Sequence, residues 1–79
     1  MNRTQKIIDK MKRQPCGISV EEASKVLMYA GYEHKRTRGS HAQYKHPDGA
    51  MFTLVRLRPT IRSVYVDQIL DILASRDLS

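Results

Sequence analysis

The sequence predicts an α+β fold in which two helices pack on one face of a three-stranded antiparallel sheet, preceded by a short helix. Two segments, residues 20–30 and 63–73, place apolar side chains at helical spacing. Between them, residues 33–57 form strand-like runs interrupted by two turn signals. Helices with one apolar stripe and a sheet with one apolar face bury these surfaces economically when both helices lie on that face.

The short leading helix is predicted over residues 4–13. Thr4 is its expected N-cap, and Pro15 and Gly17 end it, because proline interrupts a helix and glycine lets the chain turn away. Its apolar side consists of Ile7, Ile8 and Met11.

The helix that follows begins with a capping box. Ser19 and Glu22 have the spacing at which each side chain accepts a hydrogen bond from the other residue's backbone N–H. Gly31 is the expected left-handed residue after this helix.

The last helix is predicted to begin, capped, at Ser63, with Asp67 in the first turn, where its charge suits the helix dipole. The apolar stripes are Val20, Ala23, Val26, Leu27 and Ala30 in one helix and Val66, Ile69, Leu70 and Leu73 in the other.

A two-residue loop, Gly39-Ser40, is the first turn signal. Glycine adopts the positive φ that such a hairpin loop needs, and the loop places Arg38 directly opposite His41. Opposite residues share a face of the sheet, and successive residues alternate between faces. The expected open, cationic face carries His34, Arg36, Arg38, His41, Gln43 and Lys45, and the expected core face carries Glu33, Lys35, Thr37, Ala42, Tyr44 and His46.

A second turn, Pro47-Asp48-Gly49, leads to the apolar run of residues 51–57, which places Phe52 and Leu54 on the core face beside Tyr44 and Ala42. The resulting α-β-β-β-α order is that of the double-stranded-RNA-binding domain. We expect one domain over residues 1–79, with residues 1–18 as an N-terminal helical extension and residues 19–76 as the core.

The formal net charge of +6 indicates a polyanionic partner. Residues 32–62 carry seven lysines and arginines against two acidic residues, whereas residues 63–79 carry one against three. Because the positive charge gathers on the predicted sheet, nucleic-acid binding explains it better than solubility alone.

Other classes of function find little support in the sequence. The single cysteine, Cys16, excludes an intramolecular disulfide framework and favours a reducing compartment. Without a signal-peptide or membrane-span pattern, we expect a cytoplasmic protein with no membrane partner. The three histidines fall on different predicted faces without a cluster of Cys or carboxylate ligands, so we expect no metal site and no cofactor.

Several motifs resemble one family. They are Gly39-Ser40-His41 and Tyr44-Lys45-His46-Pro47-Asp48-Gly49, preceded by Ala30-Gly31-Tyr32 and followed by Val64-Tyr65-Val66-Asp67-Gln68-Ile69-Leu70. In this spacing they resemble the small HicA toxins of bacterial and archaeal toxin–antitoxin pairs, whose longer members carry an N-terminal stretch like residues 4–18.

The resemblance implies a double-stranded-RNA-binding-like fold and metal-independent cleavage of mRNA, with His41 as the essential residue. It also implies a HicB antitoxin that binds the toxin and covers the site. One departure concerns the connection after the third strand, where members often carry a His or Asn and this chain carries Arg58 and Pro59. Any auxiliary role of that connection is therefore open.

The chemistry of the residues agrees with the resemblance. RNA carries its own nucleophile, so cleavage needs a base for the 2′-hydroxyl proton and cations for the charge that develops on the phosphate. His41 is the candidate base, and nearby cations disfavour the charged imidazolium. The residues expected to bind RNA are Arg36, Arg38, Ser40, Gln43 and Lys45. The general acid is open between Lys45, His34, a protonated His41 in a later step, and water.

Two other functions remain open at this point. In a non-catalytic RNA-binding or regulatory module, the same cations hold phosphate and His41 is incidental. In a purely protein-binding partner of an acidic regulator, no salt-dependent RNA affinity is expected.

Overall fold

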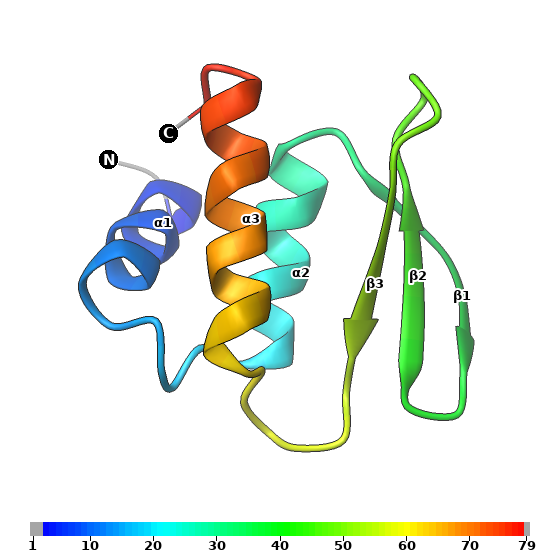
Figure 1. Ribbon diagram of the computed structural model, residues 1–79, viewed down its shortest axis with the longest axis horizontal. Coiled ribbons are helices and arrows are strands. Elements are labelled where there is room, and N and C mark those ends of the chain that lie inside the picture. The colour runs from blue at the N-terminus through cyan, green and yellow to red at the C-terminus, as the bar shows by residue number, and fades with distance from the viewer. Residues whose placement is uncertain (1–2, 79) are drawn as a thin grey trace.

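The computed structural model describes residues 3–78, which fold into helices and a sheet in the predicted order. Figure 1 shows α2 and α3 against one face of the sheet and α1 on the far side of these two helices, with no element over the opposite sheet face. The elements are α1 (Arg3–Arg13), α2 (Val20–Tyr29), β1 (Glu33–Arg38), β2 (His41–Lys45), β3 (Met51–Val55) and α3 (Ser63–Ser75).

One apolar core joins the helices to the sheet. Each helix turns its predicted stripe inward, and β2 and β3 alternate between buried and outward residues, as expected for a sheet with one covered face. The fully buried members of this core are Ile8, Met11, Ile18, Ala23, Val26, Leu27, Ala42, Leu54, Val66 and Leu73, and Tyr32, Tyr44, Phe52 and Ile69 are less than a tenth exposed.

α1 is part of this core. Ile8 and Met11 are fully buried, and the Lys10 ammonium lies 3.1 Å from the carboxylate of Glu22 on α2. Thr4 is not the N-cap that the sequence suggested, because α1 already begins at Arg3 and Thr4 lies inside it. The helix ends at Arg13, ahead of Pro15 and Gly17 as predicted.

The capping box of α2 is confirmed. The Glu22 backbone N–H donates to Ser19 Oγ, and the Ser19 backbone N–H donates to Glu22 Oε1, both at 3.0 Å. The bond from Ser19, opposed by partial burial and assisted by Lys10, holds the pKa of Glu22 below its ordinary value of 4.5. Glu22 therefore starts α2 and ties α1 to it.

The end of α2 is a Schellman motif centred on Gly31. Gly31 has φ +96°, its N–H donates to Met28, and the Tyr32 N–H donates to Leu27, each at 3.0 Å. A Cβ on Gly31 would lie 2.7 Å from Nε2 of His46, which follows β2. Glycine is thus required here for its left-handed backbone and for the close approach of the histidine.

The sheet is a meander in the order β1-β2-β3. Arg38 lies opposite His41 across the predicted hairpin turn, and Ala42 and Tyr44 lie opposite Leu54 and Phe52. The register at the turn and the core face of β2 and β3 are therefore confirmed.

The predicted register of β1 is wrong in its first half. An irregularity between His34 and Arg36 makes Lys35 an extra residue, so His34 lies opposite Tyr44 and Glu33 lies opposite Lys45. His34 consequently shares the core-side face with Tyr44, and Glu33 shares the open face with Lys45. A bulge moves side chains between faces because the strand repeat is two residues.

α3 begins at Ser63 as predicted, but its start differs from the expectation. The N-cap is Arg62, which makes no side-chain capping bond, and no acidic residue lies in the first turn. Asp67 is the fifth residue of the helix, beyond the turn in which we expected its charge.

We predict that Gly31→Ala destabilises the fold more than Gly17→Ala. Both glycines have positive φ, which costs another residue about 1–2 kcal/mol, but a Cβ at Gly17 meets nothing within 4 Å. The contact with His46 raises the expected loss for Gly31→Ala to about 3 kcal/mol in urea unfolding. Equal losses for the two variants would contradict the predicted contact.

We also predict an acid-sensitive contribution from Glu22. Because its folded pKa is lowered, its contribution to the free energy of unfolding is complete above about pH 4.5 and is lost as the pH falls through the lowered value. Glu22→Gln keeps an acceptor for Ser19 but cannot titrate, so Tm should fall less between pH 5 and pH 3. Glu21→Gln on the exposed side of α2 is the matched control and should behave like wild type.

Candidate active site

The uncovered face of the sheet presents a row of polar side chains from β1 and β2. Arg36 lies opposite Gln43 and Arg38 lies opposite His41, so each pair shares this face. The outward residues of β3 complete it. The open face comprises Glu33, Arg36, Arg38, His41, Gln43, Lys45, Met51, Thr53 and Val55.

His41 is the first residue of β2 and lies in the middle of a row that crosses the sheet. Arg38 is its register partner on β1 and Val55 is its partner on β3. The His41 side chain is exposed, and no residue in the described range 3–78 hydrogen-bonds to its imidazole or forms an ion pair with it. Both ring nitrogens are therefore available to a ligand.

The expected cations differ in their distance from His41. Arg38 is directly opposite, and Arg36 stands two residues farther along β1 on the same face. Lys45 is four residues along β2, which at a rise of about 3.3 Å per residue places its Cα about 13 Å away. Arg36 and Arg38 can thus act beside His41, whereas Lys45 can reach only a neighbouring part of a bound chain.

Within the described part of the chain, one carboxylate lies on the open face, at the end farthest from His41. Glu33 lies opposite Lys45, but its carboxylate accepts a hydrogen bond from Lys35 Nζ at 2.9 Å, which lowers the pKa of Glu33. Arg36, Arg38 and Lys45 have no ion-pair partner among residues 3–78. The cations of this face are available for an external anion.

Ser40 contributes to the site through its backbone. Its carbonyl accepts a hydrogen bond from the Arg56 N–H at 2.6 Å, which joins the hairpin turn to the residue after β3. The side chain is half-buried in the turn beside His41. Gln43 is also half-buried, one outward position along β2 from His41.

The connection between β3 and α3, residues 56–62, is held against the start of α2. Ile61 N–H donates to Ile18 O at 2.8 Å, and Val20 N–H donates to Pro59 O at 3.3 Å. The connection is therefore an ordered part of the fold, hydrogen-bonded in its middle and near its end.

This connection carries three arginines that sequence reasoning left out: Arg56, Arg58 and Arg62. Arg58 and Arg62 line a cavity that Val55 also lines, whereas Arg56 lines a different hollow together with His34 and Tyr44. All three are exposed, and none has an ion-pair partner within residues 3–78. In the sequence, these arginines form a basic run after the third strand, and this run is the pattern that could have drawn attention to them. The backbone bond from Arg56 to Ser40, which the sequence does not reveal, joins the start of this run to the hairpin turn before His41.

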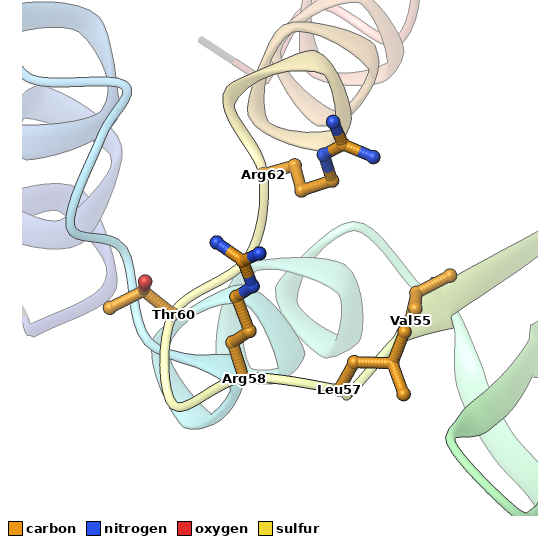
Figure 2. Close-up of a pocket in the computed structure, with 5 residues that line it drawn as sticks. All are labelled: Val55, Leu57, Arg58, Thr60 and Arg62. Carbon is orange, nitrogen blue, oxygen red and sulfur yellow. The ribbon is translucent and has the colours of Figure 1, made fainter.

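A cavity of about 160 Å³ lies between the end of β3 and the start of α3. Figure 2 shows the side chains of Arg58 and Arg62 on one side and the aliphatic side chains of Val55 and Leu57 on the other. Thr60 completes the lining. Since Val55 is the register partner of His41, the cavity borders the row that contains the histidine.

The other two histidines lie elsewhere. His34 Nε2 is 2.8 Å from Thr37 Oγ1, and its ring lies 5.2 Å from the ring of Tyr44 on the core side. His34 is thus not the neighbour of His41 that the predicted register implied, and it cannot serve there as the general acid.

His46 belongs to a cluster at the opposite end of β2. Its ring lies edge-on to Tyr32 at 5.3 Å, Nδ1 is 3.1 Å from Asp48 Oδ1, and Nε2 is 3.3 Å from Arg76 Nη1. Arg76 also pairs with Asp48 at 2.9 Å. Bonds from the Ala50 backbone and from Arg76 lower the pKa of Asp48. This cluster joins the β2–β3 turn to the end of α3.

The separation of the histidines bears on metal binding. Within residues 3–78, no three His, Cys, Asp or Glu side chains gather closely enough to hold a metal ion. The same residues include no helix with the length and apolar character needed to cross a membrane.

Comparison with known proteins identifies the family. Searches of curated proteins and of solved structures returned no match. Residues 20–73 match the model of the family described as "HicA toxin of bacterial toxin-antitoxin", a span that runs from the start of α2 almost to the end of α3 and leaves α1 outside. Because this match covers more than half of the chain and includes the Gly39-Ser40-His41 turn, the chain belongs to the HicA family of toxins from bacterial toxin–antitoxin systems.

Proposed function

We propose that this protein is a metal-independent endoribonuclease that cleaves mRNA, with His41 as the general base. The observation that carries the proposal is an exposed, unpartnered histidine beside Arg38 on an uncovered basic sheet face, in a chain of the HicA family. Membership of a toxin family supports a toxic activity, and the basic face that carries His41 supports binding and cleavage of RNA as that activity.

In the proposed reaction, a ring nitrogen of His41 takes the proton of a 2′-hydroxyl. The 2′-oxygen attacks the adjacent phosphorus, the bond to the 5′-oxygen breaks, and the departing oxygen takes up a proton. The products are a 2′,3′-cyclic phosphate and a 5′-hydroxyl. No metal is needed because the nucleophile belongs to the substrate.

Arg36 and Arg38 have the proposed role of electrostatic stabilisation. A guanidinium donates hydrogen bonds to two phosphate oxygens at once. It stabilises the additional negative charge that develops on these oxygens as the pentacoordinate phosphorus forms. Lys45, about 13 Å along the strand, is too far to protonate the leaving oxygen at the same phosphate. We therefore assign Lys45 to binding of the RNA chain and propose water as the proton donor.

A HicB-type antitoxin is the proposed protein partner. Neutralisation requires only that it cover His41, and the open face offers an apolar contact at Met51, which is 63% exposed. A partner that occupies this face excludes RNA by occupying the same cations.

We predict that His41→Ala abolishes cleavage of a long, structured RNA in the presence of EDTA, whereas His34→Ala retains it. Removal of a general base lowers the rate by about 10²–10⁴-fold. His34 is the matched control because it is an exposed histidine on a neighbouring strand that faces the other side. The measurement is the fragment pattern on a gel together with the chemistry of the fragment ends.

His41→Ala should keep the wild-type Tm, since the side chain is exposed and makes no bond within the described chain. Cyclic-phosphate ends that appear with wild type and His34→Ala only would support the proposal. Cleavage that survives in His41→Ala would overturn the role of this residue. Absence of cleavage by wild type, with salt-dependent RNA binding retained, would favour the non-catalytic RNA-binding module.

A further inference from the structure

We propose that the cavity between β3 and α3 is a nucleotide subsite, in which Arg58 and Arg62 hold a phosphate and Val55 and Leu57 contact the base. The proposal rests on the proposed function, because it takes RNA as the ligand, and it adds a second recognition site beside the cleaved bond. None of these four residues belongs to the set that the sequence assigned to RNA binding.

The charges that line the cavity favour an anion. Its polar side chains are the guanidinium groups of Arg58 and Arg62 and the hydroxyl of Thr60, all of which can donate hydrogen bonds, and no carboxylate lines it. Neither arginine has an ion-pair or hydrogen-bond partner among residues 3–78, unlike Arg76, which binds Asp48. Two unpaired guanidinium groups at one cavity match the oxygens of a phosphate.

The opposite wall is apolar. Leu57 is 76% exposed, the highest value among the large apolar side chains of the described residues, and Val55 is only half-buried. An exposed aliphatic pair beside two arginines gives an apolar contact for a base next to hydrogen-bond donors for a phosphate, and single-stranded RNA offers both groups.

The size of the cavity limits what it can hold. Its volume of about 160 Å³ is smaller than the roughly 300–1,000 Å³ of sites that enclose a whole drug-sized ligand or cofactor. One phosphate with part of its base is a ligand of the appropriate scale, while the rest of the RNA lies over the open face.

Position links the cavity to the cleavage site. Val55 is the register partner of His41, and the bond from Arg56 N–H to the Ser40 carbonyl joins the two loops. Because residues 56–62 are hydrogen-bonded to the start of α2, the cavity has its shape before RNA binds. A phosphate at His41 therefore has a neighbouring nucleotide within reach of this subsite, and the subsite helps to choose which bond is cleaved.

The test measures binding of a short single-stranded RNA with 2′-O-methyl groups, which lacks the nucleophile and stays intact whether or not the protein is a nuclease. We compare wild type with the double variant Arg58→Gln, Arg62→Gln. For single strands, log K changes by about 0.7 per phosphate contact for each tenfold change in salt. Loss of one phosphate contact should therefore weaken binding about fivefold at 0.1 M salt and lower the salt slope by about 0.7.

The control variant is Lys12→Gln, Arg13→Gln, which removes the same charge from the end of α1, behind α2 and α3 and away from the sheet (Figure 1). It should weaken binding by less than twofold and leave the slope unchanged. Equal effects of the two double variants would overturn the proposal, because the arginines would then act only through net charge.

A further variant tests the base contact. Leu57→Ser should weaken binding of the RNA severalfold while leaving binding of an abasic chain of equal length unchanged, and its high exposure predicts a wild-type Tm. Equal loss on both chains would overturn the base contact.

The remaining outcomes separate this proposal from the proposed function and from a protein ligand. If wild type cleaves ordinary RNA but the Arg58, Arg62 variant binds 2′-O-methyl RNA normally, the subsite fails and the nuclease stands. If that variant keeps RNA affinity but loses affinity for a purified HicB-type antitoxin, the cavity belongs to the protein interface and the subsite is overturned.

Discussion

The register of β2 between its two neighbours is the constraint on which the site depends. Because side chains alternate along a strand, one pairing places Ala42 and Tyr44 in the core and, by the same step, turns His41 and Gln43 outward. The core therefore fixes the orientation of His41. A one-residue slip in the register of β2 that turned His41 inward would also expose Ala42 and Tyr44. Hydrophobic burial, which favours large apolar contacts, here determines the position of polar groups that contribute nothing to the core.

The irregularity at Lys35 divides β1 into two functional halves. Near the hairpin turn, regular pairing keeps Arg36 and Arg38 on the face of His41, whereas beyond the bulge His34 turns to the core side and Glu33 turns outward. Among residues 3–78, the single carboxylate on the open face is thereby kept at the end farthest from His41, where Lys35 binds it. Bulges of this kind change which side chains reach a site without changing the fold.

The helices act on the site through the segment that joins β3 to α3. Backbone bonds to Ile18 and Val20 hold this segment against the start of α2, and the capping box at Ser19 orders that start. Lys10 on α1 binds the same Glu22 that completes the box. A chain of contacts thus runs from α1, which lies outside the span matched by the family model, to the connection whose arginines line the cavity beside Val55. The fold of the extension and the geometry of the proposed RNA face are linked.

Local patterns in the sequence determined the helices, the hairpin turn and the pair formed by Arg38 and His41, because caps, glycine turns and apolar spacing act over a few residues. Tertiary structure alone decided the bulge at Lys35, which moved His34 away from the site, and the approach of Arg58 and Arg62 to the row of His41. Neither has a local signal. A bulge depends on how two strands fit across the sheet, and the place of a connection depends on bonds to residues about forty positions earlier in the chain.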